Sequence, residues 1–222
     1  MASLRERIFS KLLRIHSRIN PVRKLNLSKF PQSTSVLNLG CGTDIHPGWI
    51  NIDAGVRPSS SKAGTVVINY DLRRGLPFDE GCIDVVYSSH FFEHLNTMDG
   101  FALMKHCLRV LKKGGVFRAA MPDARLPIRA YVAGDSAYFA KASSLVDTDL
   151  PIPELRSPID HIDLAARAWD HQALYDPDKM IRMLSRAGFT DVKVVDFDPT
   201  FDLPDELRRF FSFYVEARNP DV

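Results

Sequence analysis

The chain has 222 residues, 45% of them hydrophobic, which suits a single domain with a substantial buried core. Its formal net charge of +2 argues against a strong general attraction to nucleic acid, so no nucleic-acid partner is expected. No apolar run approaches the ~18 residues that are needed to cross a membrane. The cysteines Cys41, Cys82 and Cys107 are odd in number and share no CxxC spacing. They are therefore expected to be reduced, mostly buried thiols of a cytoplasmic protein.

The amino-terminal segment, residues 1–30, is strongly basic, with eight Lys or Arg residues and one acid. Apolar residues recur there every three or four positions, at Leu4, Ile8, Leu12, Ile15 and Ile19. This spacing predicts an amphipathic helix with a basic outer face. Such a helix could pack on the domain, could dock on a membrane surface or a partner through residues 1–22, or could be a cleaved transit peptide. We expect the first, with residues 31–222 as the domain.

The next stretch predicts a strand, a glycine loop and a second strand. Val36–Leu39 alternates apolar residues with Asn38, as a buried strand does. Gly40–Gly42 then ends the strand, and glycine lets backbone N–H groups crowd against the polar atoms of a ligand. The second strand, Trp49–Ile52, ends at Asp53, where a carboxylate can accept both hydroxyls of a ribose. This arrangement indicates a nucleoside site.

The loop departs from the dinucleotide fingerprint, which needs a third glycine at the start of a helix and an acid about 20 residues on. Position 45 is Ile, and Asp53 follows Gly40 by only thirteen residues. Pro47 and Gly48 leave no room for a full crossover helix, so a pyrophosphate would lack the helix N-terminus on which it normally rests. A ligand without phosphate suits this loop better, which disfavours a nucleotide-dependent oxidoreductase.

Further elements follow in order. Apolar and β-branched runs predict strands at Val66–Tyr70, Ile83–Ser88, Val116–Met121, Val192–Phe197 and Phe211–Arg218. A helix capped by Thr97 or Asp99 is expected to end at residues 112–114. Its buried face is predicted to comprise Phe101, Met104, Leu108 and Leu111. A second helix is capped by Asp176 and ends at Gly188. Asp84 is expected to be a buried structural acid, and Pro204–Arg209 a helical turn.

Residues 123–175 break the regular alternation of strands and helices. This segment holds several prolines, with aromatic residues scattered among charges. An insertion of this length after a core strand is usually functional. We expect one or two helices there that lie over the strand ends and form an acceptor pocket.

The motifs together resemble a known family. Leu37–Gly42 looks like motif I of the class I S-adenosylmethionine-dependent methyltransferases, and Asp53 matches their ribose-binding acid. Further matches, which reach about Gly188, are Tyr70–Leu72, Leu76–Phe78, Asp84–Tyr87 and Leu111–Gly115. The chain resembles a branch with a shortened link between the first two strands. The resemblance implies a Rossmann-like α/β fold with a mostly parallel seven-stranded sheet and helices on both faces.

The resemblance also implies S-adenosylmethionine as the cofactor. The cofactor-binding residues that it suggests are Asn38, Gly40, Cys41, Gly42, Asp53, Asp71, Leu72, Ser88 and His90. Asp71 falls where the family places an acid or amide near the adenine amine, although it could instead cap the turn before Leu72.

Methyl transfer from a sulfonium is an in-line displacement, so the enzyme mainly aligns the acceptor and excludes water. A hydroxyl acceptor also benefits from a base near neutral pH, for which His90 and His171 are the catalytic candidates. His90 leaves a strand at the end of the sheet where ligands bind, although it could equally be a structural histidine.

The stretch His90–His94 also matches H-x-x-E-H, the inverted zinc-protease signature. It follows a strand in a cofactor-type fold, and no third ligand can be named from the sequence. No metal site is therefore expected, with a divalent ion that assists an acceptor hydroxyl as the alternative.

The expected function is methylation of a small-molecule acceptor, first of all at a hydroxyl of a sugar or polyketide-like metabolite. The expectation rests on the polar, aromatic-bearing insertion and on the lack of a strong basic groove. A protein acceptor and an inactive nucleoside-binding partner subunit are the alternatives. The sequence carries no signal for an oligomeric state.

Overall fold

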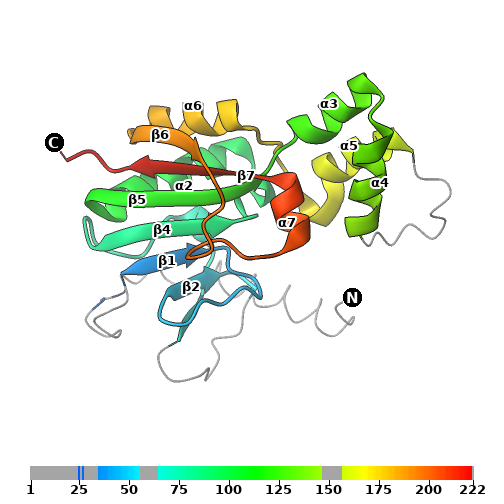
Figure 1. Ribbon diagram of the computed structural model, residues 1–222. Helices are drawn as coiled ribbons and strands as arrows, with labels where there is room; N and C mark the ends of the chain where they lie inside the picture. Colours follow the sequence, from blue (N-terminus) through cyan, green and yellow to red (C-terminus); the bar gives the residue numbers. More distant parts are fainter. Residues whose placement is uncertain (1–24, 26, 28–34, 56–64, 147–156, 222) are drawn as a thin grey trace.

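The computed structural model describes residues 25, 27, 35–55, 65–146 and 157–221, so the predicted amino-terminal helix lies outside the described residues. A seven-stranded sheet in the order β3-β2-β1-β4-β5-β7-β6 forms the centre of the molecule (Figure 1). The strands are β1 (Val36–Leu39), β2 (Ile50–Asp53), β3 (Val66–Asn69), β4 (Ile83–Ser89), β5 (Leu111–Pro122), β6 (Thr190–Val195) and β7 (Ser212–Arg218). Strand β7 runs opposite to the other six strands of the described residues. The predicted mostly parallel seven-stranded α/β fold is confirmed.

The helices fall into two groups around this sheet. The α-helices are α2 (Thr97–Val110), α3 (Arg125–Ala133), α4 (Ser136–Leu145), α5 (Pro158–Arg167), α6 (Pro177–Ala187) and α7 (Glu206–Phe211). Single 3-10 turns are η2 (Leu72–Arg74), η3 (Phe92–His94) and η5 (Ala168–Asp170). Helices α2 and α6 pack on the sheet and on each other. Helices α3, α4 and α5 pack together beyond the end of β5 (Figure 1). No helix in the described part of the chain is long and apolar enough to span a bilayer.

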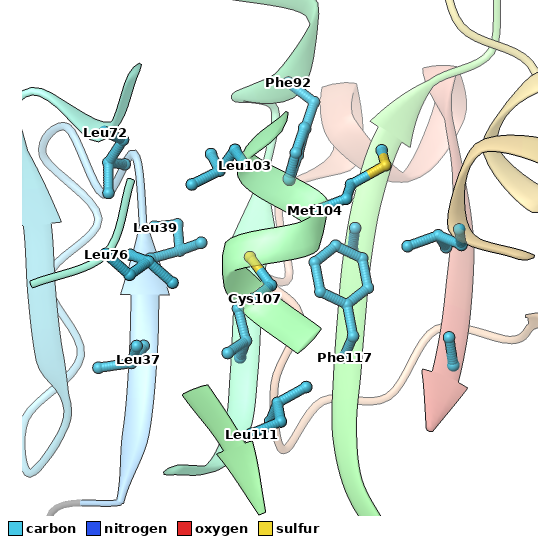
Figure 2. Packing of buried hydrophobic residues seen from close by; sticks show 14 of the residues in the cluster. Leu37, Leu39, Leu72, Leu76, Phe92, Leu103, Met104, Cys107, Leu111 and Phe117 are labelled. Atoms are coloured by element: carbon cyan, nitrogen blue, oxygen red, sulfur yellow. The ribbon is translucent and has the colours of Figure 1, made fainter. Parts of the chain in front are cut away.

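One face of the sheet carries the hydrophobic core. Alternate residues of each strand point to this face, among them Leu37 and Leu39 of β1 and Phe117 of β5. Helix α2 covers them with Leu103, Met104 and Cys107 (Figure 2). Leu25 and Leu27 also pack against this core, and Leu25 N donates to Pro77 O (2.6 Å), so packing on the domain extends before residue 31.

The opposite face of the sheet carries a polar row. Strand register aligns Asn51, Asn38, Tyr87, Arg118 and Glu216 from β2 to β7. The Arg118 side chain is only 2% exposed, and it forms ion pairs with Asp202 and with Glu216 (2.7 Å to the latter). The segment that carries Asp202 is therefore anchored to this face.

Several local predictions need correction. The cap of α2 is Asn96, whose Oδ1 accepts from Asp99 N (2.9 Å), rather than Thr97 or Asp99. Of the predicted buried face of α2, Met104 and Leu111 are buried as expected, whereas Phe101 and Leu108 are only partly buried. The sequence prediction missed the buried residues Leu103, Cys107 and Val110.

Strand β5 starts at Leu111, before the predicted helix end at residues 112–114 and the predicted strand start at Val116, because Leu111 already pairs with Ile83 of β4. Asp84 is not buried: its side chain is 47% exposed and pairs with Lys112 at 2.8 Å. By contrast, α6 begins after the Asp176 cap and ends at Gly188 as predicted, with Gly188 at φ 110°. The link between β1 and β2 consists of turns without a helix, also as predicted.

Candidate functional site

The glycine loop after β1 makes a sharp turn at the carboxyl end of the sheet. Gly40 and Gly42 have φ of 64° and 50°, which side chains with a Cβ rarely adopt. A Cβ on Gly40 would lie 2.1 Å from the Phe91 ring, whereas one on Gly42 would meet no atom within 4 Å. Gly40 is thus required by packing against Phe91, and Gly42 is the position where the loop is open.

Asp53 ties this loop to the end of β2. Its Oδ2 accepts from Gly42 N (3.1 Å) and its Oδ1 from Gly55 N (2.7 Å). An ionised carboxylate has about four acceptor sites, so both oxygens keep capacity for ligand hydroxyls.

Asp71, at the end of β3, does cap the following turn. Its Oδ1 accepts from Arg73 N (3.1 Å), and it pairs with the Arg73 guanidinium at 2.6 Å. The capping role that the sequence left open is therefore present, and Asp71 also lines the cavity described next.

The loop and these strand ends enclose a polar cavity of about 390 Å³, which we call the cofactor cavity. It lies where the strand order reverses between β1 and β4, the position at which open α/β sheets bind ligands. Of the predicted cofactor residues, those that line it are Gly40, Cys41, Gly42, Asp53, Asp71, Leu72 and His90. The other two lie elsewhere, because the Asn38 amide bonds Asn51 and Asp44 O, and Ser88 is fully buried.

The cysteines are mostly buried, as the sequence predicted. Cys41, Cys82 and Cys107 are all free, and Cys41 and Cys107 are buried. Burial raises the pKa of Cys41 to about 12, so its thiol stays protonated in the cavity wall.

A second cavity of about 290 Å³ adjoins the first, and we call it the acceptor cavity. His90, His94, Trp169 and Arg208 line both. Its other walls are mainly apolar and come from β5, α3, α5 and α7: Pro122, Ala124, Pro127, Leu164, Ala165, Leu207 and Phe211. The predicted insertion thus contributes much of this cavity.

His90 lies at the junction of the two cavities. Its backbone has φ of 49°, an uncommon conformation that is typical of functional sites when the surroundings enforce it. The ring shares a hydrogen bond between Nε2 and Ser212 Oγ (2.6 Å), and Nδ1 lies 3.5 Å from Glu93 Oε1. Burial, with Arg208 adding to it, lowers the pKa of His90 to about 3, so the ring is neutral and binds a proton weakly.

Glu93, the acid of the H-x-x-E-H match, lines the acceptor cavity together with His94 and His171. It is 2% exposed, and neither carboxylate oxygen has a hydrogen-bond partner among the described residues. Burial raises the pKa of Glu93 to about 8. The donor atoms of Glu93, His94 and His171 lie within 4.8 Å of one another, and we call these three residues the polar cluster.

The sequence did not single out three residues that line the cofactor cavity, namely Trp169, Asp170 and Arg208. Trp169 (φ 54°) and Asp170 (φ 65°) form a strained turn that lines the cofactor cavity. Arg208 of α7 pairs with Asp44 of the glycine loop at 2.6 Å and donates to Ser89 Oγ at 3.2 Å. Helix α7 is thereby linked to the loop that ends β1.

The comparison with protein families agrees with this architecture. A family model described as a methyltransferase domain matches residues 4–194. Among curated proteins, none matches the sequence significantly.

Similar solved structures include the phosphoethanolamine N-methyltransferase 2 of Haemonchus contortus in complex with S-adenosylmethionine. It aligns with a TM-score of 0.52 and 13% identity over 96% of this chain and 53% of that chain. A chain from the complex of the Haloferax volcanii Trm112 methyltransferase activator with a methyltransferase aligns with a TM-score of 0.51 and 17% identity. The alignment covers 97% of this chain and 91% of that chain. A methyltransferase from Archaeoglobus fulgidus aligns over 97% of this chain and 98% of that chain, with 17% identity and a TM-score of 0.48.

The cofactor cavity fits S-adenosylmethionine, the ligand of the Haemonchus contortus structure. It offers an open glycine turn at Gly42, the Asp53 carboxylate for ribose hydroxyls and a polar wall at the switch point of the sheet. S-Adenosylmethionine supplies an electrophilic methyl group on a sulfonium when it is bound. The chain belongs to the methyltransferase domain family, and its cofactor is S-adenosylmethionine.

Proposed function

We propose that this protein transfers a methyl group from S-adenosylmethionine to a hydroxyl group of a largely apolar small molecule. The observation that carries this proposal is the acceptor cavity, which shares the wall of His90, His94, Trp169 and Arg208 with the cofactor cavity. A molecule held there lies next to the cofactor without filling its place.

The lining of the acceptor cavity favours one acceptor class over another. Burying a hydroxyl without a hydrogen-bond partner is costly, so a sugar would lose more than it gains against walls such as Leu164, Leu207 and Phe211. A polyketide-like or aromatic alcohol buries apolar surface there and needs polar partners for one group only. We therefore favour this class over a sugar. The volume of about 290 Å³ suits a small molecule.

The reaction also requires that the acceptor is positioned and that its hydroxyl proton leaves, and the polar groups of the acceptor cavity bear on both. As the new O–C bond forms, the S–C bond breaks and its electron pair stays on sulfur, while the hydroxyl proton must leave. His90 holds a proton poorly, so we assign it to positioning at the junction, where Ser212 fixes its ring. The polar cluster, including His171, lines the same cavity and gives it a polar side, past which the proton leaves to solvent.

A cavity-filling variant tests the proposal. Leu164→Trp should abolish methyl transfer to apolar alcohols and phenols while the affinity for S-adenosylmethionine stays within about twofold, because Leu164 lines the acceptor cavity only. The matched control is Ile159→Trp on the same helix, where Ile159 is 49% exposed and lines neither cavity. Transfer of labelled methyl groups is measured over a panel of apolar alcohols, sugars and peptides. Transfer to sugars or peptides alone, or full activity of Leu164→Trp, would contradict the proposal.

A further inference from the structure

Three side chains with metal-binding donor atoms meet on one wall of the acceptor cavity. Glu93 and His94 come from η3, and His171 directly follows η5, far along the chain. Their donor atoms all lie within 4.8 Å of one another. We propose that the polar cluster is a binding site for one divalent transition-metal ion of the zinc class, although the sequence alone led us to expect no metal.

The two segments that carry these donors are bonded to each other through their backbones. Gln172 N and Ala173 N both donate to Glu93 O, at 2.7 and 3.2 Å. The Gln172 side-chain amide donates to His94 O at 3.0 Å. The two segments that carry the donors are therefore held together by contacts with main-chain carbonyls that do not depend on the ion, so a metal ion needs only side-chain adjustment.

The hydrogen bonding of His171 is that of a metal ligand. Its Nδ1 lies 2.9 Å from Ala165 O, and a carbonyl can only accept, so Nδ1 carries the ring proton. The lone pair is then on Nε2. Histidine ligands of metal ions characteristically donate their other ring nitrogen to a carbonyl or carboxylate in this way.

Glu93 supplies the second independent observation. Its carboxylate is 2% exposed, yet both oxygens lack a hydrogen-bond partner among the described residues. A buried carboxylate is normally paired, hydrogen-bonded or bound to a metal ion. A cation among Glu93, His94 and His171 would satisfy it.

The donor set points to zinc and similar ions. Two imidazoles and one carboxylate form a common catalytic zinc site, in which an exogenous molecule takes the fourth position. At metal–ligand distances of about 2.0–2.2 Å, neighbouring ligands of a tetrahedral ion lie about 3.4 Å apart, so donor atoms within 4.8 Å of one another need to converge by about 1.4 Å at most. All three residues line the acceptor cavity, so a molecule in that cavity would take the fourth position.

The consequence for catalysis rests on the proposed function. A hydroxyl of the acceptor that binds in the open position would lose its proton more readily, because a metal ion lowers the pKa of a bound hydroxyl. The oxygen would then attack the methyl group, and the proton would leave to solvent. Metal binding itself does not depend on this role.

The test measures metal binding directly on the full-length, chelator-treated protein. Titration with Zn²⁺, and with Co²⁺ followed by its visible absorption, should give one ion per chain. His94→Ala and His171→Ala should each weaken binding by at least tenfold, and Glu93→Gln, which keeps the side-chain shape, should do the same. The matched control is His161→Ala: His161 lines the same cavity but bonds to Ser143 and lies outside the cluster, so affinity should not change.

Two results would overturn the inference: substoichiometric binding by the wild-type protein, or wild-type affinity in the His94→Ala/His171→Ala double variant. Thermal unfolding of each metal-free variant separates loss of a ligand from loss of the fold. Methyl transfer by a protein that binds no metal would refute this site and leave the proposed function standing. Stoichiometric metal binding without methyl transfer to any apolar alcohol or phenol would refute the proposed function and leave the metal site standing.

Discussion

Asp53 illustrates how one side chain serves both the loop and the ligand. Its carboxylate holds Gly42 N and Gly55 N while facing the cofactor cavity. We expect Asp53→Ala to weaken binding of S-adenosylmethionine by roughly 10- to 100-fold, because a hydrogen bond to a charged group contributes about 1.5–3 kcal/mol. Calorimetric titration measures this affinity. Glu80→Ala, a change at an exposed residue that lines neither cavity, is the control. Unchanged affinity for S-adenosylmethionine in Asp53→Ala would show that Asp53 does not bind the cofactor.

Glu93 gives a prediction about pH. Burial raises its pKa from 4.5 to about 8, so in the metal-free protein near neutral pH it is protonated when folded and ionised when unfolded. Unfolding then releases a proton, and the free energy of unfolding that Glu93 contributes falls as pH rises from about 4.5 to about 8.

The Glu93→Gln variant lacks this titration. Relative to wild type, its free energy of unfolding should therefore rise between about pH 5 and pH 8, by at most about 1.4 kcal/mol per pH unit. Urea denaturation at several pH values in the presence of a chelator measures the difference. A difference that does not vary with pH would show that Glu93 is already ionised in the folded protein.

At the scale of elements, the ion pairs of Arg118 anchor the segment between β6 and α7 to the sheet. Arg118 also donates to Asp196 O (2.8 Å), and Asp202 accepts in turn from Asp198 N (2.8 Å). We expect Asp202→Ala to lower the free energy of unfolding by about 3–5 kcal/mol, because it leaves a buried guanidinium with one carboxylate fewer.

The surface pair of Lys112 and Asp84 provides the control for this prediction. Both side chains are 47% exposed, so Lys112→Ala should cost less than about 1 kcal/mol. Urea denaturation of the two variants measures both effects. If both variants lost the same free energy of unfolding, the buried ion pair of Arg118 would stabilise the fold no more than the surface pair does.

At the scale of the whole molecule, the cofactor cavity joins segments from across the chain. Its walls come from the glycine loop, the ends of β2 and β3, the turn at residues 169–172 and α7. A ligand that binds only the folded chain stabilises it by about 2.7 kcal/mol at one hundred times its Kd. S-Adenosylhomocysteine at that ratio should therefore raise the melting temperature by roughly 5–10 °C. Calorimetry checks this shift, and its absence would mean that the cavity does not take the cofactor.

Local chemistry let the sequence determine much of this protein. The alternation of Val36–Leu39, the turn at Gly40–Gly42 and the cap of α6 at Asp176 each depend on neighbouring residues, so they could be read along the chain. The resemblance to methyltransferase motifs supplied the sheet and the cofactor. The predicted buried face of α2 was right only in part, and the predicted start of β5 was wrong, because packing against the sheet and pairing with β4 decided them.

Only the tertiary structure decided the chemistry of the acceptor site. Glu93, His171 and Arg208 are separated by tens of residues, and no spacing rule relates them. They meet because η3, the turn after η5 and α7 converge at the carboxyl ends of the strands. Burial, which raises the pKa of Glu93 and lowers that of His90, arises only from that convergence. The sequence thus determined the fold family and the cofactor, whereas the apolar lining and the polar cluster depend on contacts between distant segments.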